Sequence, residues 1–84
     1  MKSSKANTIL KELEEVAEKL GIKIRYEKTK ARGGLCKKDE QFMIIIDKAS
    51  NPHYKITVLS EALKGFDLDG IYISPKIREL LEDA

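Results

Sequence analysis

The sequence predicts an α+β domain in which helices pack on a small, mainly antiparallel sheet of three or four strands. Two observations lead to this class: apolar residues recur with helical spacing towards both ends of the chain, and they alternate with period two in between. The expected order of elements is α-β-β-β-α-(β)-α. A chain of 84 residues can bury one core but not two, so residues 1–84 are expected to form a single domain.

The first helix is predicted from the stretch between Ile9 and Leu20. Its apolar residues fall on one stripe of a helix, and its charged residues occupy the opposite face. Asn7 or Thr8 can cap the first turn, and Gly21 supplies the left-handed backbone that commonly ends a helix. Residues 1–6 precede this pattern and are expected to be disordered.

Three strands are predicted after this helix. Residues 22–27 alternate between apolar and polar side chains, as in a strand with one buried and one wet face, which places Tyr26 on the core side. A second short strand is predicted around residues 34–37, followed by a polar turn at residues 38–40. Residues 42–46 are apolar on both faces, which indicates the central strand of the sheet, contacted from both directions. Hairpin connections would make the three strands an antiparallel meander.

Two more helices are predicted in the second half of the chain. Asn51-Pro52 and Ser74-Pro75 each combine a capping side chain with a proline suited to the first helical position. Residues 71–73 form either a short edge strand or an extended linker, and the final helix is expected to close an edge of the sheet. The predicted core combines the stripes of the first two helices with Ile24, Tyr26, Phe42, Ile44 and Ile46.

The composition excludes several classes of protein. A hydrophobic content of 42% with 36% charged residues is typical of a soluble globular protein. A single cysteine excludes an intramolecular disulfide framework, and no apolar run has the length that spans a membrane. The first residues lead into an amphipathic segment and contain no apolar signal core. These features predict a soluble, reduced, cytoplasmic protein that does not associate with membranes.

The charge pattern offers the main functional signal. Residues 23–38 contain seven basic side chains and one acid, whereas the flanking segments, residues 8–22 and 39–84, are acidic on balance. If the first strand and the following loop share a surface, they form a site for phosphates or for an acidic protein. The alternative is a solvated strand face whose charges only keep the domain soluble. The residues predicted to form this site are Lys23, Arg25, Lys28, Lys30, Arg32, Gly33 and Gly34, with Lys37 at its end.

Catalytic and metal chemistry finds little support in the sequence. Cys36 and His53 are the only members of their classes, too few for a zinc site, and nothing in the sequence brings them together as a nucleophile and its base. Gly33-Gly34 lacks the context of a dinucleotide or P-loop site and fits a turn. Residues 67–70 superficially match the start of a calcium loop but lack its later ligands. We therefore expect no catalytic residue, no metal and no cofactor.

Most of the chain resembles a small bacterial family of uncharacterised proteins. The resemblance lies in Gly33-Gly34-Leu35-Cys36, residues 43–47, residues 54–63, residues 71–75 and residues 78–81. The central order is also similar to the core of ImmA/IrrE-type zinc metallopeptidases, in which a glycine-containing hairpin and an apolar strand precede a His-Glu-x-x-His helix. This resemblance implies a peptidase scaffold without its chemistry, because Glu61 takes the place of the catalytic acid but no histidine flanks it.

These observations lead to three functional hypotheses. The first is a non-enzymatic binding module whose basic hairpin surface meets an acidic partner, either protein or nucleic acid. The second is an enzyme that works through Cys36 or an unrecognised carboxylate site. The third is a self-associating structural protein, a homodimer in which a second copy covers the apolar strand.

Overall fold

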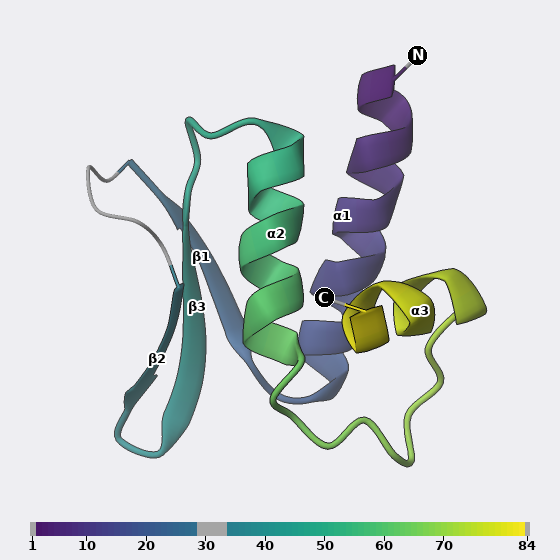
Figure 1. The fold of residues 1–84 in the computed structure, drawn as a ribbon. Helices are drawn as coiled ribbons and strands as arrows, with labels where there is room; N and C mark the ends of the chain where they lie inside the picture. The colour runs from purple at the N-terminus through teal and green to yellow at the C-terminus, as the bar shows by residue number, and fades with distance from the viewer. Residues whose placement is uncertain (1, 29–33, 84) are drawn as a thin grey trace.

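The structure of the protein is a computed structural model, and it describes residues 2–28 and 34–83. These residues form three helices and one three-stranded sheet, so the predicted α+β class is confirmed (Figure 1). In chain order the elements are α1 (Lys2–Lys19), β1 (Lys23–Glu27), β2 (Gly34–Lys38), β3 (Gln41–Asp47), α2 (Pro52–Leu63) and α3 (Pro75–Asp83). The optional strand at residues 71–73 is not formed, and this segment is the extended linker of the two alternatives.

The sheet has the strand order β1-β3-β2, and its centre is the strand that the sequence predicts to be central. β2 pairs antiparallel with β3, through a two-residue turn in which Asp39 and Glu40 both have positive φ, 51° and 66°. That geometry matches the turn type that suits the twist of a tight hairpin. β1 pairs with the other side of β3 in parallel, with Lys23 opposite Met43. The sheet is therefore mixed, and the expected antiparallel meander is wrong at β1.

All three helices lie on one side of the sheet, and no described element covers the other side (Figure 1). Ile44 and Ile46 of β3 point towards the helices and are fully buried. Met43 and Ile45 alternate with them, point the opposite way and are half-buried. The two-sided apolar character of β3 therefore reflects one packed face and one open face, not two covered ones.

α1 begins earlier than the sequence pattern indicates. It starts at Lys2, so residues 2–6, which were expected to be disordered, are helical, and neither Asn7 nor Thr8 is its cap. Ala6 is only 3% exposed, so the helix gains packing in its second turn, and tertiary contact outweighs a local capping preference. Gly21 follows the helix with φ of 77°, as predicted.

The two later helices begin as predicted. The Asn51 side chain accepts a hydrogen bond from the Tyr54 amide at 2.8 Å, and Pro52 occupies the first turn of α2. Ser74 accepts from the Ile77 amide at 3.4 Å at the start of α3. α3 does not close a sheet edge, however, because Ile77 and Leu81 are buried in the core and the helix packs against α1 and α2 (Figure 1).

One apolar core lies between the helices and the inner face of the sheet. Its buried members are Leu13, Val16, Ala17, Ile22, Ile44, Ile46, Leu59, Ala62, Leu63, Ile73, Ile77 and Leu81. Ile24 and Phe42 pack at its margin, as predicted for core residues. The Phe42 ring meets the Phe66 ring edge to face, with centroids 5.0 Å apart.

Candidate functional site

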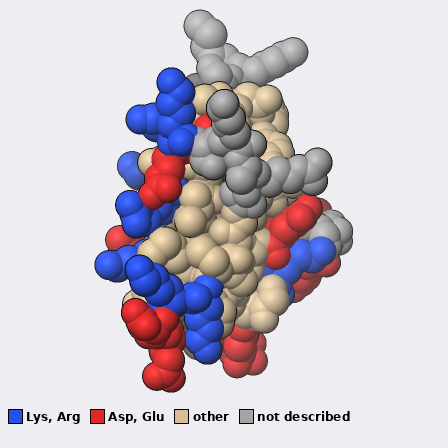
Figure 2. Space-filling view, turned by 90° about the vertical axis from the view of Figure 1, so that its left-hand side faces the viewer, with Lys and Arg blue, Asp and Glu red and all other residues tan. Residues whose placement is uncertain are grey.

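The open side of the sheet, here called the outer face, consists of three short columns of side chains. In register, Lys23 lies beside Met43 and Arg25 beside Ile45, and Cys36 and Gly34 lie on the opposite side of these two apolar residues. Figure 2 looks onto this side of the molecule, where uncharged atoms form the centre and Lys and Arg side chains gather along one margin and the lower end. Acidic side chains lie among them, so the face is basic at its border without being a continuous cationic surface.

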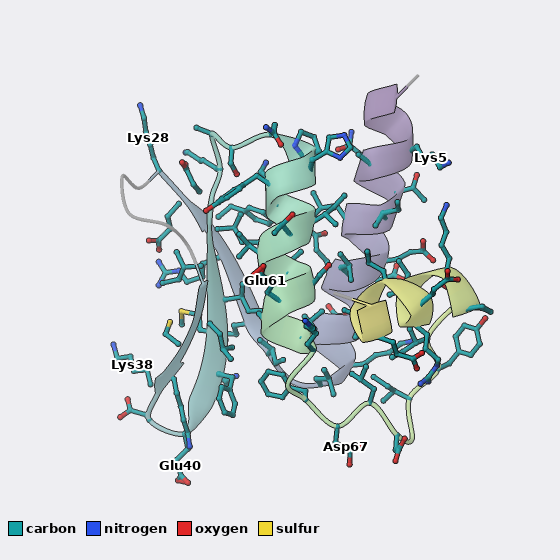
Figure 3. The ribbon with its side chains drawn as sticks, in the orientation of Figure 1. Lys5, Lys28, Lys38, Glu40, Glu61 and Asp67 are labelled. Carbon is teal, nitrogen blue, oxygen red and sulfur yellow. The ribbon has the colours of Figure 1, made fainter. Side chains whose placement is uncertain are left out.

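The two strands that carry the described residues of the predicted basic site do not pair with each other. Lys23 and Arg25 belong to β1, whereas Gly34 belongs to β2, and β3 separates the two strands. Arg25 is ion-paired with Glu27 of its own strand at 2.8 Å. Lys28 lies at one end of the sheet and Lys38 near the other (Figure 3). Lys30, Arg32 and Gly33 lie outside the described residues.

β2 places its two lysines on opposite sides of the sheet. Lys37 lies opposite Phe42 on the helix side, and its Nζ is 5.3 Å from the centre of the Phe42 ring. Lys38 lies opposite Gln41 on the outer face. Within residues 2–28 and 34–83, the one ion pair is that between Arg25 and Glu27, so neither lysine of β2 is ion-paired in that part of the chain.

A groove of about 460 Å³ runs between the free edge of β2 and α2. Its helical wall is a stripe with the spacing of one helix face, and its strand wall includes Leu35, which is 42% exposed. Glu61 of α2 lies on the helical wall and is marked in Figure 3. Its lining residues are Gly34, Leu35, Tyr54, Thr57, Val58, Glu61 and Ala62. Sequence reasoning missed the groove, although the spacing from Tyr54 to Glu61 is visible as i, i+3, i+4 and i+7.

Tyr26 connects β1 to both long helices. Its side chain lies on the helix side of the sheet, as predicted, but at the edge, where it remains 38% exposed. The hydroxyl donates a hydrogen bond to Glu14 of α1, and the Lys55 Nζ of α2 lies 5.5 Å from the ring centre. Partial burial, followed by the hydrogen bond and the negative charge of Glu14, raises the pKa of this hydroxyl well above its ordinary value of 10.0.

Replacing Tyr26 by Phe is expected to lower the free energy of unfolding by about 1 kcal/mol at pH 7, through loss of this hydrogen bond. Because the folded-state pKa is raised, the contribution of the hydroxyl is complete below pH 10 and falls as the pH rises above it. Urea unfolding of both proteins between pH 7 and pH 10.5 should therefore show their difference shrinking at the alkaline end. A difference that stays constant would contradict the proposed coupling of Tyr26 to Glu14.

The other candidate chemical groups do not come together. Cys36 points outward from β2, whereas His53 is exposed in the first turn of α2, beside a groove that Ala6, Ile9 and Leu80 also line. Among the described residues, no three His, Cys, Asp or Glu side chains are placed to hold a metal ion. The Asp67 side chain accepts a hydrogen bond from the Asp69 amide at 3.0 Å. This local turn contact explains the acidic residues of this loop without a bound metal ion.

No protein-family model, curated protein or solved structure matches this chain. The resemblances to a small bacterial family and to a metallopeptidase scaffold therefore stay predictions. Among the described residues, no helix has both the length and the apolar character needed to cross a membrane.

Proposed function

We propose that this protein is a small, non-enzymatic binding module whose outer sheet face docks an acidic segment of another protein. One observation carries the proposal: Met43 and Ile45 form an apolar strip that no described element covers, with Lys23 and Arg25 directly beside it. Apolar contact at the centre with charge at the border is the usual composition of a protein interface.

An acidic protein suits this face better than a nucleic acid does. Single-stranded nucleic acids are usually held by aromatic side chains on which bases stack. The outer columns contain no aromatic ring: Tyr26 and Phe42 lie on the helix side of the sheet. The net charge is only +2, and Glu27 and Asp47 lie side by side at the end of the same face. A polyanionic backbone would meet these carboxylates, whereas a short acidic segment can avoid them.

The test is a fluorescence-anisotropy titration with a labelled peptide of alternating Glu and Leu, beside single-stranded and duplex oligonucleotides, at 50 and 200 mM salt. We expect the peptide to bind, to bind more weakly at the higher salt, and to lose about tenfold in affinity in the double variant Lys23→Glu/Arg25→Glu. These substitutions replace exposed side chains, and the ion pair lost with Arg25 is a surface pair of small value.

The matched control reverses two lysines of α1, Lys5→Glu/Lys11→Glu, which changes the net charge equally on the other side of the molecule. An equal loss in the control would assign the binding to net charge alone and overturn the proposed face. Tighter binding of the oligonucleotides than of the peptide would instead make the partner a nucleic acid. Absence of binding by every probe at low salt would leave the outer face a solvated surface.

A further inference from the structure

In the described part of the chain, β2 is an edge strand of the sheet, and its outer edge is unpaired. Among the described strands, β2 pairs with β3 on one side, and no described strand pairs with the backbone groups along its other side. An exposed strand edge is a template for pairing with another chain. Here the edge also opens into the groove beside α2, where Leu35 is 42% exposed. Both the backbone and the apolar wall can therefore receive a further strand.

We propose that β2 pairs antiparallel with β2 of a second copy of this chain, so that the two sheets join into one continuous sheet. The two-fold axis lies midway between the two copies of Cys36. In this register Cys36 faces Cys36 of the second copy on the outer face, and Leu35 faces Lys37 of the second copy on the helix side. The remaining pair, Gly34 with Lys38, also lies on the outer face.

Side-chain direction and charge select this register. A two-fold axis perpendicular to the sheet keeps outward side chains opposite outward ones, so the axis must lie midway between one residue and the same residue of the second copy. An axis at Lys37 would place two lysines directly opposite each other, which is unfavourable. An axis at Leu35 would pair fewer of the residues that form β2. The axis at Cys36 pairs all five residues of Gly34–Lys38 and places no like charges directly opposite.

Charge complementarity identifies the second copy as the occupant. Lys37 of the partner, opposite Leu35, enters the groove that Leu35 lines together with Glu61. Its aliphatic part can cover Leu35 while its ammonium group reaches the Glu61 carboxylate. By symmetry the same contact forms twice, because each chain supplies both the acidic groove and the basic strand. Neither Lys37 nor Glu61 has an ion pair within the described residues of a single chain.

The expected dimer is weak and concentration-dependent. The interface consists of a five-residue strand pair and a shallow groove, which is at the low end of the size of stable protein interfaces. It uses none of the side chains tested for docking on the outer face, because Lys23 and Arg25 lie on β1, on the far side of β3. Its failure would therefore leave the proposed function untouched, and the reverse also holds.

Cys36 gives a direct test of the register. Opposed residues of an antiparallel pair have Cα atoms about 4.5 or 5.5 Å apart, and both spacings suit a disulfide. With oxidised glutathione, two Cys36 thiols give one disulfide as the oxidant takes up two electrons and two protons to form two reduced glutathiones. We expect rapid formation of a disulfide-linked dimer, which dithiothreitol reverses. The control variant, Cys36→Ser with Lys11→Cys, carries its exposed thiol on α1 and should cross-link far more slowly.

A charge exchange tests the predicted contact without any cysteine chemistry. In a Cys36→Ser background, sedimentation velocity over a concentration series should show a reversible dimer. Glu61→Lys and Lys37→Glu should each raise its dissociation constant about tenfold, and the two together should recover most of the loss. A protein that stays monomeric up to millimolar concentration and cross-links no faster than the control would overturn the proposal. The proposal would also be overturned if the double variant lost as much dimer affinity as the two single variants lose together. The groove would then be open to an extended segment of a different protein.

Discussion

Ile44→Asn is expected to unfold the protein under conditions in which Ile45→Asn leaves it folded. Ile44 is fully buried between the sheet and the helices, and a polar amide there would lose its packing and find no hydrogen-bond partner. The expected cost is about 4 kcal/mol. Ile45 is the next residue along β3, but its side chain is on the outer face and half-buried, so its replacement should cost about 1 kcal/mol.

The measurement is urea unfolding followed by circular dichroism at low micromolar protein concentration. The free energy of unfolding of a domain of this size is expected to be about 5–10 kcal/mol. The Ile44 variant should therefore unfold at a much lower urea concentration than the unchanged protein. Ile44→Val and Ile45→Val are matched conservative controls and should both stay close to the unchanged protein. Equal destabilisation by the two asparagine variants would show that the outer face is covered, and would remove the basis of the proposed docking surface.

This pair of residues also shows how far the sequence could predict the sheet. Five consecutive apolar residues predict a central strand, and β3 does lie between β1 and β2. They do not say whether a layer of structure covers both faces. That depends on where the helices pack, and all three lie on the same side (Figure 1). An open apolar face has the same local composition as a buried one.

The direction of β1 could not be predicted from its own residues either. Its alternating pattern shows which side chains face the core, and that pattern is the same for parallel and antiparallel pairing. The tight turn at Asp39 and Glu40 fixes β2 as the antiparallel neighbour of β3. β1 then pairs with the other edge of β3, and its own residues do not decide whether it runs parallel or antiparallel to β3.

The same strand order separates the described residues of the predicted basic site. Lys23 and Lys38 are close in sequence, and a meander would have joined their strands directly. With β3 inserted between β1 and β2, the charges become a border on either side of an apolar strip. The groove beside α2 was missed because Thr57 and Glu61 read as an ordinary solvated helix face. Only the position of the β2 edge turns that face into a wall.

Ile77→Ala in α3 is expected to lower the free energy of unfolding by about 3 kcal/mol. The side chain is 1% exposed and belongs to the same core as Leu13 and Ile44, although the helix lies far from both in sequence. Of the described helices and strands, α3 contacts α1 and α2, so its attachment depends on the side chains that it buries. Urea unfolding should show one transition shifted to lower denaturant for the whole protein.

Lys76→Ala is the neighbouring control, since Lys76 is exposed and should change stability by less than about 0.5 kcal/mol. Hydrogen exchange separates the two ways in which α3 could respond to the loss of Ile77. If the helix belongs to the common core, amides of β3 and α1 lose protection together with those of α3. Faster exchange confined to α3, with β3 unchanged, would contradict a single cooperative core and show that the last helix opens independently of the sheet.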